Sequence, residues 1–126
     1  MPDWLIRIVP VANPTPAVPA AFIPALRDAH AGTPLTAQVD DIVVWGNTTN
    51  EEHWPWPVDA SGNPLPDNRV PPGLRLSDPI PANTSSNNYD VTMPATGNTI
   101  NYCCKLHPQM RGEIIVTAIP PAPPSA

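Results

Sequence analysis

Soft metal-ligand side chains gather near the C-terminal end of the chain. Cys104, His107 and Met110 bring a thiol, an imidazole and a thioether together at the spacing Cys-x-x-His-x-x-Met. A tight loop at a strand end would let all three reach one point, and Pro108 and Gly112 favour such a bend. A thiolate with imidazoles and a weak thioether suits a trigonal copper ion and serves hard cations poorly. The cluster therefore predicts a copper site.

A further imidazole must come from elsewhere in the chain, and His30 and His53 are the remaining histidines. His53 follows the apolar run 41–46 by a few residues, so a loop leaving that strand could place it above the strand that delivers Cys104. His30 lies next to Asp28 in a Pro/Ala-rich stretch with no apolar strand before it. We therefore predict that His53 is the remote ligand and that His30 is a surface histidine.

The strands that would carry these ligands are short apolar and β-branched runs between turn-forming residues. Proline interrupts almost every window of helical length, which excludes long amphipathic helices. The pattern predicts an all-β sandwich or barrel of antiparallel strands. The expected strands span Trp4–Val11, part of Pro34–Val39, Asp41–Gly46, Asn88–Thr92, Thr99–Cys104 and Gly112–Ile119.

Two long connections between these strands are rich in proline. The first, 12–33, is also rich in alanine, and we expect one helical turn at Ala25–His30. The second, 56–86, contains SGNP, LPDN and PPG, which are turn-forming segments. We expect one or two further strands there, with one near Leu74–Leu76.

Length and composition limit the kinds of protein that this chain could be. Its 126 residues suffice for one domain, which we assign to 1–119, followed by a Pro-rich flexible tail at 120–126. Acidic residues outnumber basic ones by 11 to 6, and Lys105 is the only lysine. This balance disfavours nucleic acid and anionic membranes as partners and favours a basic protein. The chain has no apolar run of roughly 20 residues and no signal-peptide pattern, so we expect no membrane insertion.

The ligand cluster and an earlier strand together resemble the cupredoxins, the blue copper proteins. The run V-V-W-x-N at Val43–Asn47 precedes His53, and the run Y-x-C-x-x-H-P-x-M-x-G-x-I-x-V extends from Tyr102 to Val116. The second match is specific and covers fifteen residues, whereas the Pro-rich middle of the chain has no counterpart. The short spacing on both sides of His107 is similar to amicyanin more than to plastocyanin.

The resemblance implies a Greek-key β-sandwich of about seven or eight strands with one copper ion per chain at one end. Cys104 would supply a short thiolate bond, His53 and His107 the other equatorial ligands, and Met110 a long axial contact. The implied function is one-electron transfer between redox partner proteins, not enzymatic catalysis. The alternative is Cu(I) binding for copper delivery or resistance. The resemblance also implies a periplasmic or otherwise extracytoplasmic location, and we expect a monomer.

Two tryptophans lie close to His53 in the sequence His-Trp-Pro-Trp-Pro. Trp54 and Trp56 could shield the metal, or they could form an apolar patch with His107 and Pro108 on which a redox partner docks. Alternatively, one or both tryptophans pack in the core.

Two other sulfur residues are candidates for a role at the metal. Adjacent strand residues face opposite sides, so Cys103 and Cys104 cannot easily face one ion. We expect Cys103 to be a small buried apolar residue; the alternatives are a second bridging thiolate at a dinuclear copper site and a donor to Cu(I). Met93 is an alternative axial ligand, although a core position beside Val91 is favoured.

Overall fold

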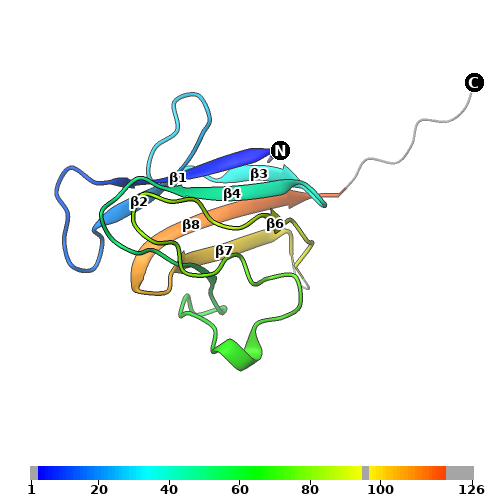
Figure 1. Ribbon diagram of the computed structural model, residues 1–126. Coiled ribbons are helices and arrows are strands. Elements are labelled where there is room, and N and C mark those ends of the chain that lie inside the picture. Colours follow the sequence, from blue (N-terminus) through cyan, green and yellow to red (C-terminus); the bar gives the residue numbers. More distant parts are fainter. Residues whose placement is uncertain (1–2, 95–96, 119–126) are drawn as a thin grey trace, which may run out of the picture.

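Two four-stranded sheets stack against each other and enclose the hydrophobic core (Figure 1). The computed structural model describes residues 3–94 and 97–118. In spatial order, the first sheet contains β2 (Ala20–Pro24), β1 (Trp4–Pro10), β4 (Ile42–Asn47) and β6 (Tyr89–Asp90). The second sheet contains β3 (Leu35–Gln38), β8 (His107–Thr117), β7 (Thr99–Cys104) and β5 (Pro55–Pro57). Within the described ranges the one helical element is the 3₁₀ turn η1 (Asp67–Arg69). The predicted Greek-key β-sandwich of about seven or eight strands is thereby confirmed.

Alternate residues of the strands fill the space between the sheets. In β1, Ile6 and Ile8 are buried, whereas Leu5 and Arg7 are exposed. This alternation follows from the strand geometry, because successive side chains point to opposite faces of a sheet.

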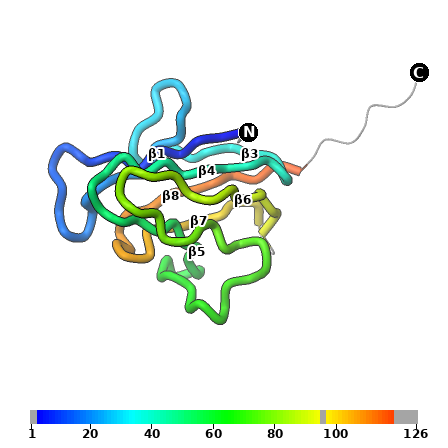
Figure 2. The backbone as a smooth tube through the Cα atoms, viewed as in Figure 1, coloured from blue at the N-terminus to red at the C-terminus, as the bar shows by residue number. Residues whose placement is uncertain are grey.

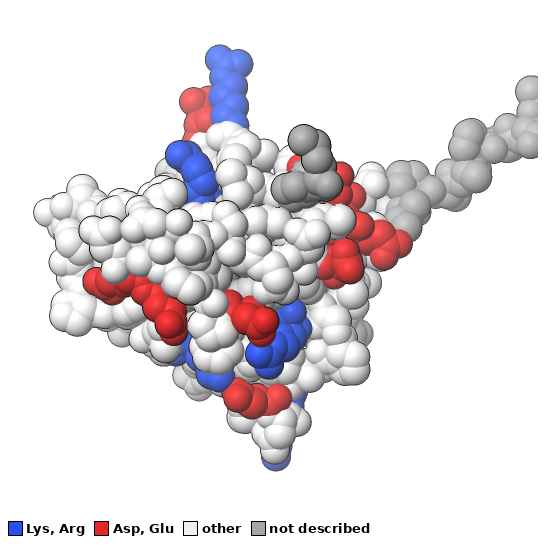
Figure 3. Space-filling model, viewed as in Figure 1, with Lys and Arg blue, Asp and Glu red and all other residues white. Residues whose placement is uncertain are grey.

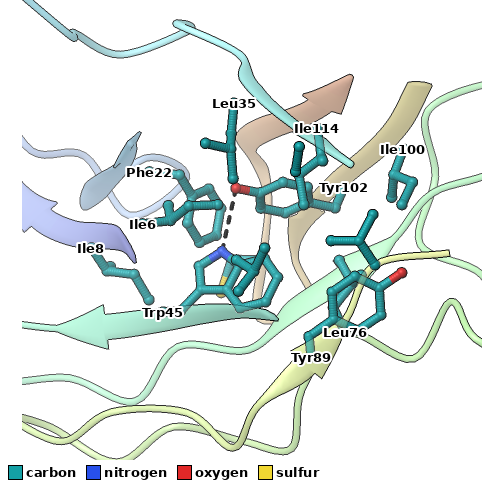
Figure 4. Packing of buried hydrophobic residues seen from close by; sticks show 14 of the residues in the cluster. Ile6, Ile8, Phe22, Leu35, Trp45, Leu76, Tyr89, Ile100, Tyr102 and Ile114 are labelled. Carbon is teal, nitrogen blue, oxygen red and sulfur yellow. Dashed lines mark hydrogen bonds between the residues drawn. The ribbon is translucent and has the colours of Figure 1, made fainter. Parts of the chain in front are cut away.

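An aromatic group joins the two sheets beside the strand that ends in Cys104 (Figure 4). The rings of Trp45 from β4 and Tyr102 from β7 meet edge to face, with centroids 5.6 Å apart. The indole N–H of Trp45 donates a hydrogen bond of 3.3 Å to the Tyr102 hydroxyl. Phe22 from β2 contacts the same tyrosine ring at 4.9 Å between centroids. Because these side chains are buried and mutually fixed, β7 has little freedom to move relative to the first sheet.

The prediction that the strands are all antiparallel is wrong, because each sheet contains one parallel pair. β1 pairs in parallel with β4, and β3 pairs in parallel with β8. Parallel neighbours need a crossover connection. Here the chain passes from β1 and β2 to β3 in the second sheet before it returns as β4.

The sequence prediction missed two strands, β2 and β5, and both lie at sheet edges and contain proline. Proline has no N–H for the ladder, so edges are where a strand tolerates it. The expected helical turn at Ala25–His30 is wrong: Asp28 has a φ of 59°, which is a left-handed conformation in a turn. No strand forms at Leu74–Leu76 among the described residues, although Leu76 is fully buried.

The long connection from β5 to β6 runs from the edge of the second sheet to the edge of the first (Figure 2). It returns to the sandwich through a pair of main-chain hydrogen bonds between Ile80 and His53. None of the described segments forms a helix of the length and apolarity needed to cross a bilayer. The predicted tail at 120–126 lies outside the described residues.

Candidate metal centre

Three separate elements bring three potential metal donors to one point. Cys104 is the last residue of β7, His107 is the first residue of β8, and His53 lies in the loop between β4 and β5. The Cys104 Sγ is 3.6 Å from Nδ1 of His53 and 3.5 Å from Nδ1 of His107. One potential ligand atom from each residue lies within 4.8 Å of the others. The structure thus assembles three of the four residues that the sequence predicts as ligands.

The spacing of these atoms fits a single bound metal ion. With bonds of about 2.3 Å to a thiolate and about 2.0 Å to an imidazole, donors at tetrahedral to trigonal angles lie about 3.5 to 3.7 Å apart. The observed Sγ–Nδ1 distances of 3.5 and 3.6 Å match that range. One thiolate with two imidazoles is also the equatorial donor set of blue-copper sites. The residues present therefore fit a copper ion.

A two-residue turn is what places Cys104 beside His107. These two residues pair directly across β7 and β8, with a register irregularity between Cys103 and Cys104. β8 consequently begins at His107, earlier than the predicted start at Gly112. Irregularities of this kind re-aim neighbouring side chains, and here the Cys104 sulfur lies beside His53 and His107.

The main chain of His53 is held by a pair of hydrogen bonds to Ile80. Its N–H donates to the Ile80 carbonyl at 3.1 Å and its carbonyl accepts from the Ile80 N–H at 2.8 Å. The next main-chain N–H, that of Trp54, donates to the Cys104 sulfur at 3.3 Å. The hydrogen bond between the two loops is therefore donated by the main chain of Trp54 and not by its side chain.

Asn47, at the end of β4, organises the loop that leads to His53. Its side-chain N–H₂ donates to the carbonyls of Glu51, Ile80 and Pro81 at 2.7, 3.2 and 3.2 Å. Its side-chain oxygen accepts from the N–H and the hydroxyl of Thr49 at 3.0 and 2.7 Å. Because Asn47 is buried, these polar groups have no water to replace a lost partner. The asparagine of the V-V-W-x-N run is thus the part of the site that a sequence pattern could have identified.

We expect Asn47→Ala to lower the free energy of unfolding by about 2 kcal/mol, because several buried carbonyls would lose their donor. Urea unfolding of the metal-free protein measures this change. Asn50→Ala is the matched control, since Asn50 is exposed and makes a single side-chain contact of 3.3 Å with Asn83. Equal stability of the two variants would show that the Asn47 hydrogen bonds do not organise the loop.

Burial shifts the pKa values of two of the candidate ligands, Cys104 and His53. Burial raises the pKa of the Cys104 thiol, and the main-chain N–H groups of Trp54, Leu106 and His107 act in the opposite direction. Burial, followed by the nearby His107, lowers the pKa of His53. His53 is therefore favoured in the neutral form that a metal requires, whereas Cys104 would release a proton when a metal binds.

The two histidines differ in their access to solvent. His53 is 1% exposed, whereas the side chain of His107 is 17% exposed. Nε2 of His107 lies 4.0 Å from a carboxylate oxygen of Glu51 at the surface. Of the two histidines, His107 is therefore the candidate ligand that is accessible to solvent.

Solved structures with the same architecture are known. Models of protein families give no match to this sequence, and neither do curated proteins. A purple cupredoxin from Nitrosopumilus maritimus superposes with a TM-score of 0.61 at 17% identity, covering 91% of this chain and 100% of that chain. The chain has a cupredoxin fold. A proline-to-glycine mutant of amicyanin, in its reduced Cu(I) form at pH 4, gives a TM-score of 0.51 at 16% identity, covering 93% of this chain and 86% of that chain.

The fourth predicted ligand of this cupredoxin fold lies on the same strand as His107. Met110 is buried in β8 as part of the core cluster, three residues beyond His107. Its role as an axial ligand stays a prediction. Met93 is 41% exposed, so the expectation that it occupies a core position is wrong.

The two remaining candidates among the sequence-predicted residues lie outside the donor group. His30 is exposed, as expected of a surface histidine. Cys103 is fully buried, and burial raises the pKa of its thiol to about 11. It therefore has the predicted character of a small buried residue, and no contact in the described structure supports a second bridging thiolate.

The two tryptophans next to His53 have different environments. Trp56 is fully buried and its indole N–H donates to the Leu65 carbonyl at 2.7 Å. Of the alternatives that the sequence left open, Trp56 therefore takes the core position, and its ring has no accessible surface for a docking patch. Trp54 is only partly buried, and its indole N–H donates to the Ser77 carbonyl at 2.8 Å.

Proposed function

We propose that this chain is a mononuclear copper protein that carries single electrons between redox partner proteins. The observation that supports this function is the buried Cys104 sulfur with an imidazole nitrogen of His53 on one side and of His107 on the other, at 3.6 and 3.5 Å. His53, Cys104 and His107 would hold the ion, with Met110 as the proposed axial ligand. Bound copper would supply the one-electron change between Cu(II) and Cu(I).

The protein would hold the donor side chains in the same positions in both oxidation states of the copper. Cys104 is fixed by the β7–β8 pairing and by the Trp54 N–H. His53 is fixed by the Ile80 backbone. Because the donors are already within bonding geometry of a common point, little rearrangement would accompany an electron. A small rearrangement favours fast transfer in both directions.

The partially exposed edge of His107 is the proposed exit for electrons. Around it lie Leu106, which is 46% exposed, and Pro108, which is also exposed. We propose that a redox partner docks on His107, Leu106, Pro108 and the exposed part of Trp54. The acidic Glu51 beside His107 and the net charge of −5 favour a partner with basic groups around its own apolar patch. Charged side chains on the face in Figure 3 lie in small separate groups, so a broad charged interface is not expected there.

We further propose that the chain acts outside the reducing cytosol and is not an enzyme. The support for both is the cupredoxin fold together with a single group of soft donors in the described residues. An electron carrier needs one metal that changes charge, and this site has the donors for one ion.

The experiment that tests this function is repeated reduction and reoxidation of the copper-loaded protein, followed by voltammetry and by absorption spectroscopy. We expect one equivalent of copper to cycle reversibly between Cu(II) and Cu(I) over several rounds. The His53→Ala variant should lose this behaviour, and the matched His30→Ala variant should keep it. A protein that holds Cu(I), forms no stable Cu(II) complex and gives its copper to a chelator would contradict the proposal and favour copper delivery.

A further inference from the structure

The only lysine of the chain lies against two tryptophan rings beside the metal ligands. Lys105 directly follows Cys104, and its ammonium group is 4.3 Å from the ring centroid of Trp54 and 4.1 Å from that of Trp56. The two indole rings pack edge to face, with their centroids 5.1 Å apart. A cation within about 6 Å of an indole face is attracted by the electrons of the ring. The Lys105 side chain is only 25% exposed, which strengthens this attraction.

The same ammonium group pairs with Asp67 at the start of η1. This contact joins the metal-binding turn to the long connection between β5 and β6. The hydrogen bond from Lys105 lowers the pKa of the Asp67 carboxyl, which favours the ionised carboxylate. Lys105 is therefore held from three directions, by two rings and one carboxylate.

Trp54 contacts both the Lys105 ammonium group and the Cys104 sulfur. Its main-chain N–H donates to the Cys104 sulfur at 3.3 Å, and its carbonyl accepts from the Lys105 N–H at 2.8 Å. Its ring N–H donates to Ser77, and its ring face contacts the Lys105 ammonium. The contacts of Lys105 and the hydrogen bond to the Cys104 sulfur thus meet in one residue, Trp54.

We propose that Lys105 is a positioning residue for Cys104: through its contacts with Trp54, Trp56 and Asp67, it keeps the Trp54 N–H on the ligand sulfur. This inference rests on the proposed copper function. A hydrogen bond to a thiolate neutralises part of its negative charge. It therefore favours the reduced state of the centre, which carries one positive charge less. Lys105 consequently raises the reduction potential.

The charge of Lys105 could also act directly on the copper, and Asp67 distinguishes the two effects. If only charge mattered, Asp67→Asn would remove a negative charge near the site and raise the potential. If Lys105 acts by positioning Trp54, Asp67→Asn loosens the lysine and lowers the potential. The two explanations thus predict opposite signs for one substitution.

The experiment compares four variants with two measurements. In the metal-free protein, amide hydrogen exchange of Trp54 should become about tenfold faster in Lys105→Met, because a cation–π pair and an ion pair are lost. It should change in the same direction in Asp67→Asn. Lys105→Arg keeps both contacts and should restore slow exchange. Arg75→Met is the matched control, because the described cation–π contact of Arg75 is with Trp56, at 5.4 Å, and this variant should leave the Trp54 exchange unchanged.

In the copper-loaded protein, Lys105→Met and Asp67→Asn should both have a lower midpoint potential than the wild type. A higher potential in Asp67→Asn, or unchanged Trp54 exchange in Lys105→Met, would overturn the positioning role. If copper does not cycle at all, the proposed function fails. The exchange measurement in the metal-free protein still decides whether Lys105 positions Trp54.

Discussion

The Cys104→Ala variant is expected to lose the intense visible thiolate-to-copper band. Its affinity for copper should fall by at least about 100-fold, because loss of a residue that only supports a ligand can already lower metal affinity by up to about 100-fold. The physical reason is the position of its sulfur, which lies 3.6 and 3.5 Å from the two imidazole nitrogens. Within the described residues no other thiol belongs to the donor group. Titration of the variant with Cu(II), followed by absorption spectroscopy, measures both changes.

Cys103→Ala is the matched control for this experiment. Cys103 is equally buried and adjacent in sequence, but it pairs with Trp56 and Arg111 in the neighbouring strands and stays outside the donor group. The variant should keep the visible band and bind one equivalent of copper. Loss of the band in Cys103→Ala, or its survival in Cys104→Ala, would refute the assignment of Cys104 as the ligand.

The second large effect is expected for Gly112→Ala, which should lower the free energy of unfolding by about 3 kcal/mol or more, the upper end of the cost of overpacking. A β-carbon at Gly112 would lie 2.3 Å from Cζ and 2.5 Å from the hydroxyl oxygen of Tyr102. The two residues are cross-strand partners, so the tyrosine ring covers the glycine. The ring cannot move aside, because it is buried against Trp45 and Phe22.

Gly46→Ala provides the comparison within the other sheet. A β-carbon at Gly46 would meet only Cδ1 of Leu5 at 3.4 Å, and Leu5 is 38% exposed and can shift. We expect the free energy of unfolding of the Gly46→Ala variant to differ from that of the wild type by less than about 1 kcal/mol. Urea unfolding of both variants measures the difference. If Gly112→Ala were as stable as Gly46→Ala, the close packing of Tyr102 on β8 would be wrong.

The part of the candidate metal site formed by Cys104 and His107 could be predicted from the sequence because these residues lie close together along the chain. Cys104 and His107 are three residues apart, and a thiol and an imidazole at that spacing favour a site for a soft metal ion. His53 could also be predicted, because it follows a strongly apolar strand that had to lie in the core. The structure places these three side chains together.

The parts of the site that depend on distant segments could not be predicted. The bridge from His53 to Ile80 joins two Pro-rich loops, and neither loop has a repeating pattern that would reveal the pairing. From the sequence, Trp56 could lie in an exposed patch or in the core, and its burial involves contacts with Leu65 and Arg75 in the long connection after β5. The edge strand β5 was missed because two of its three residues are prolines.

X-ray absorption spectroscopy of the protein loaded with one equivalent of Cu(II) tests the central claim most directly, because it counts the sulfur and nitrogen atoms bound to the metal. The account predicts one short sulfur ligand from Cys104 and two nitrogen ligands from His53 and His107. His53→Ala should remove one of the nitrogens and leave the sulfur. A copper ion bound only by nitrogen and oxygen atoms, or by two short sulfur ligands, would contradict the account.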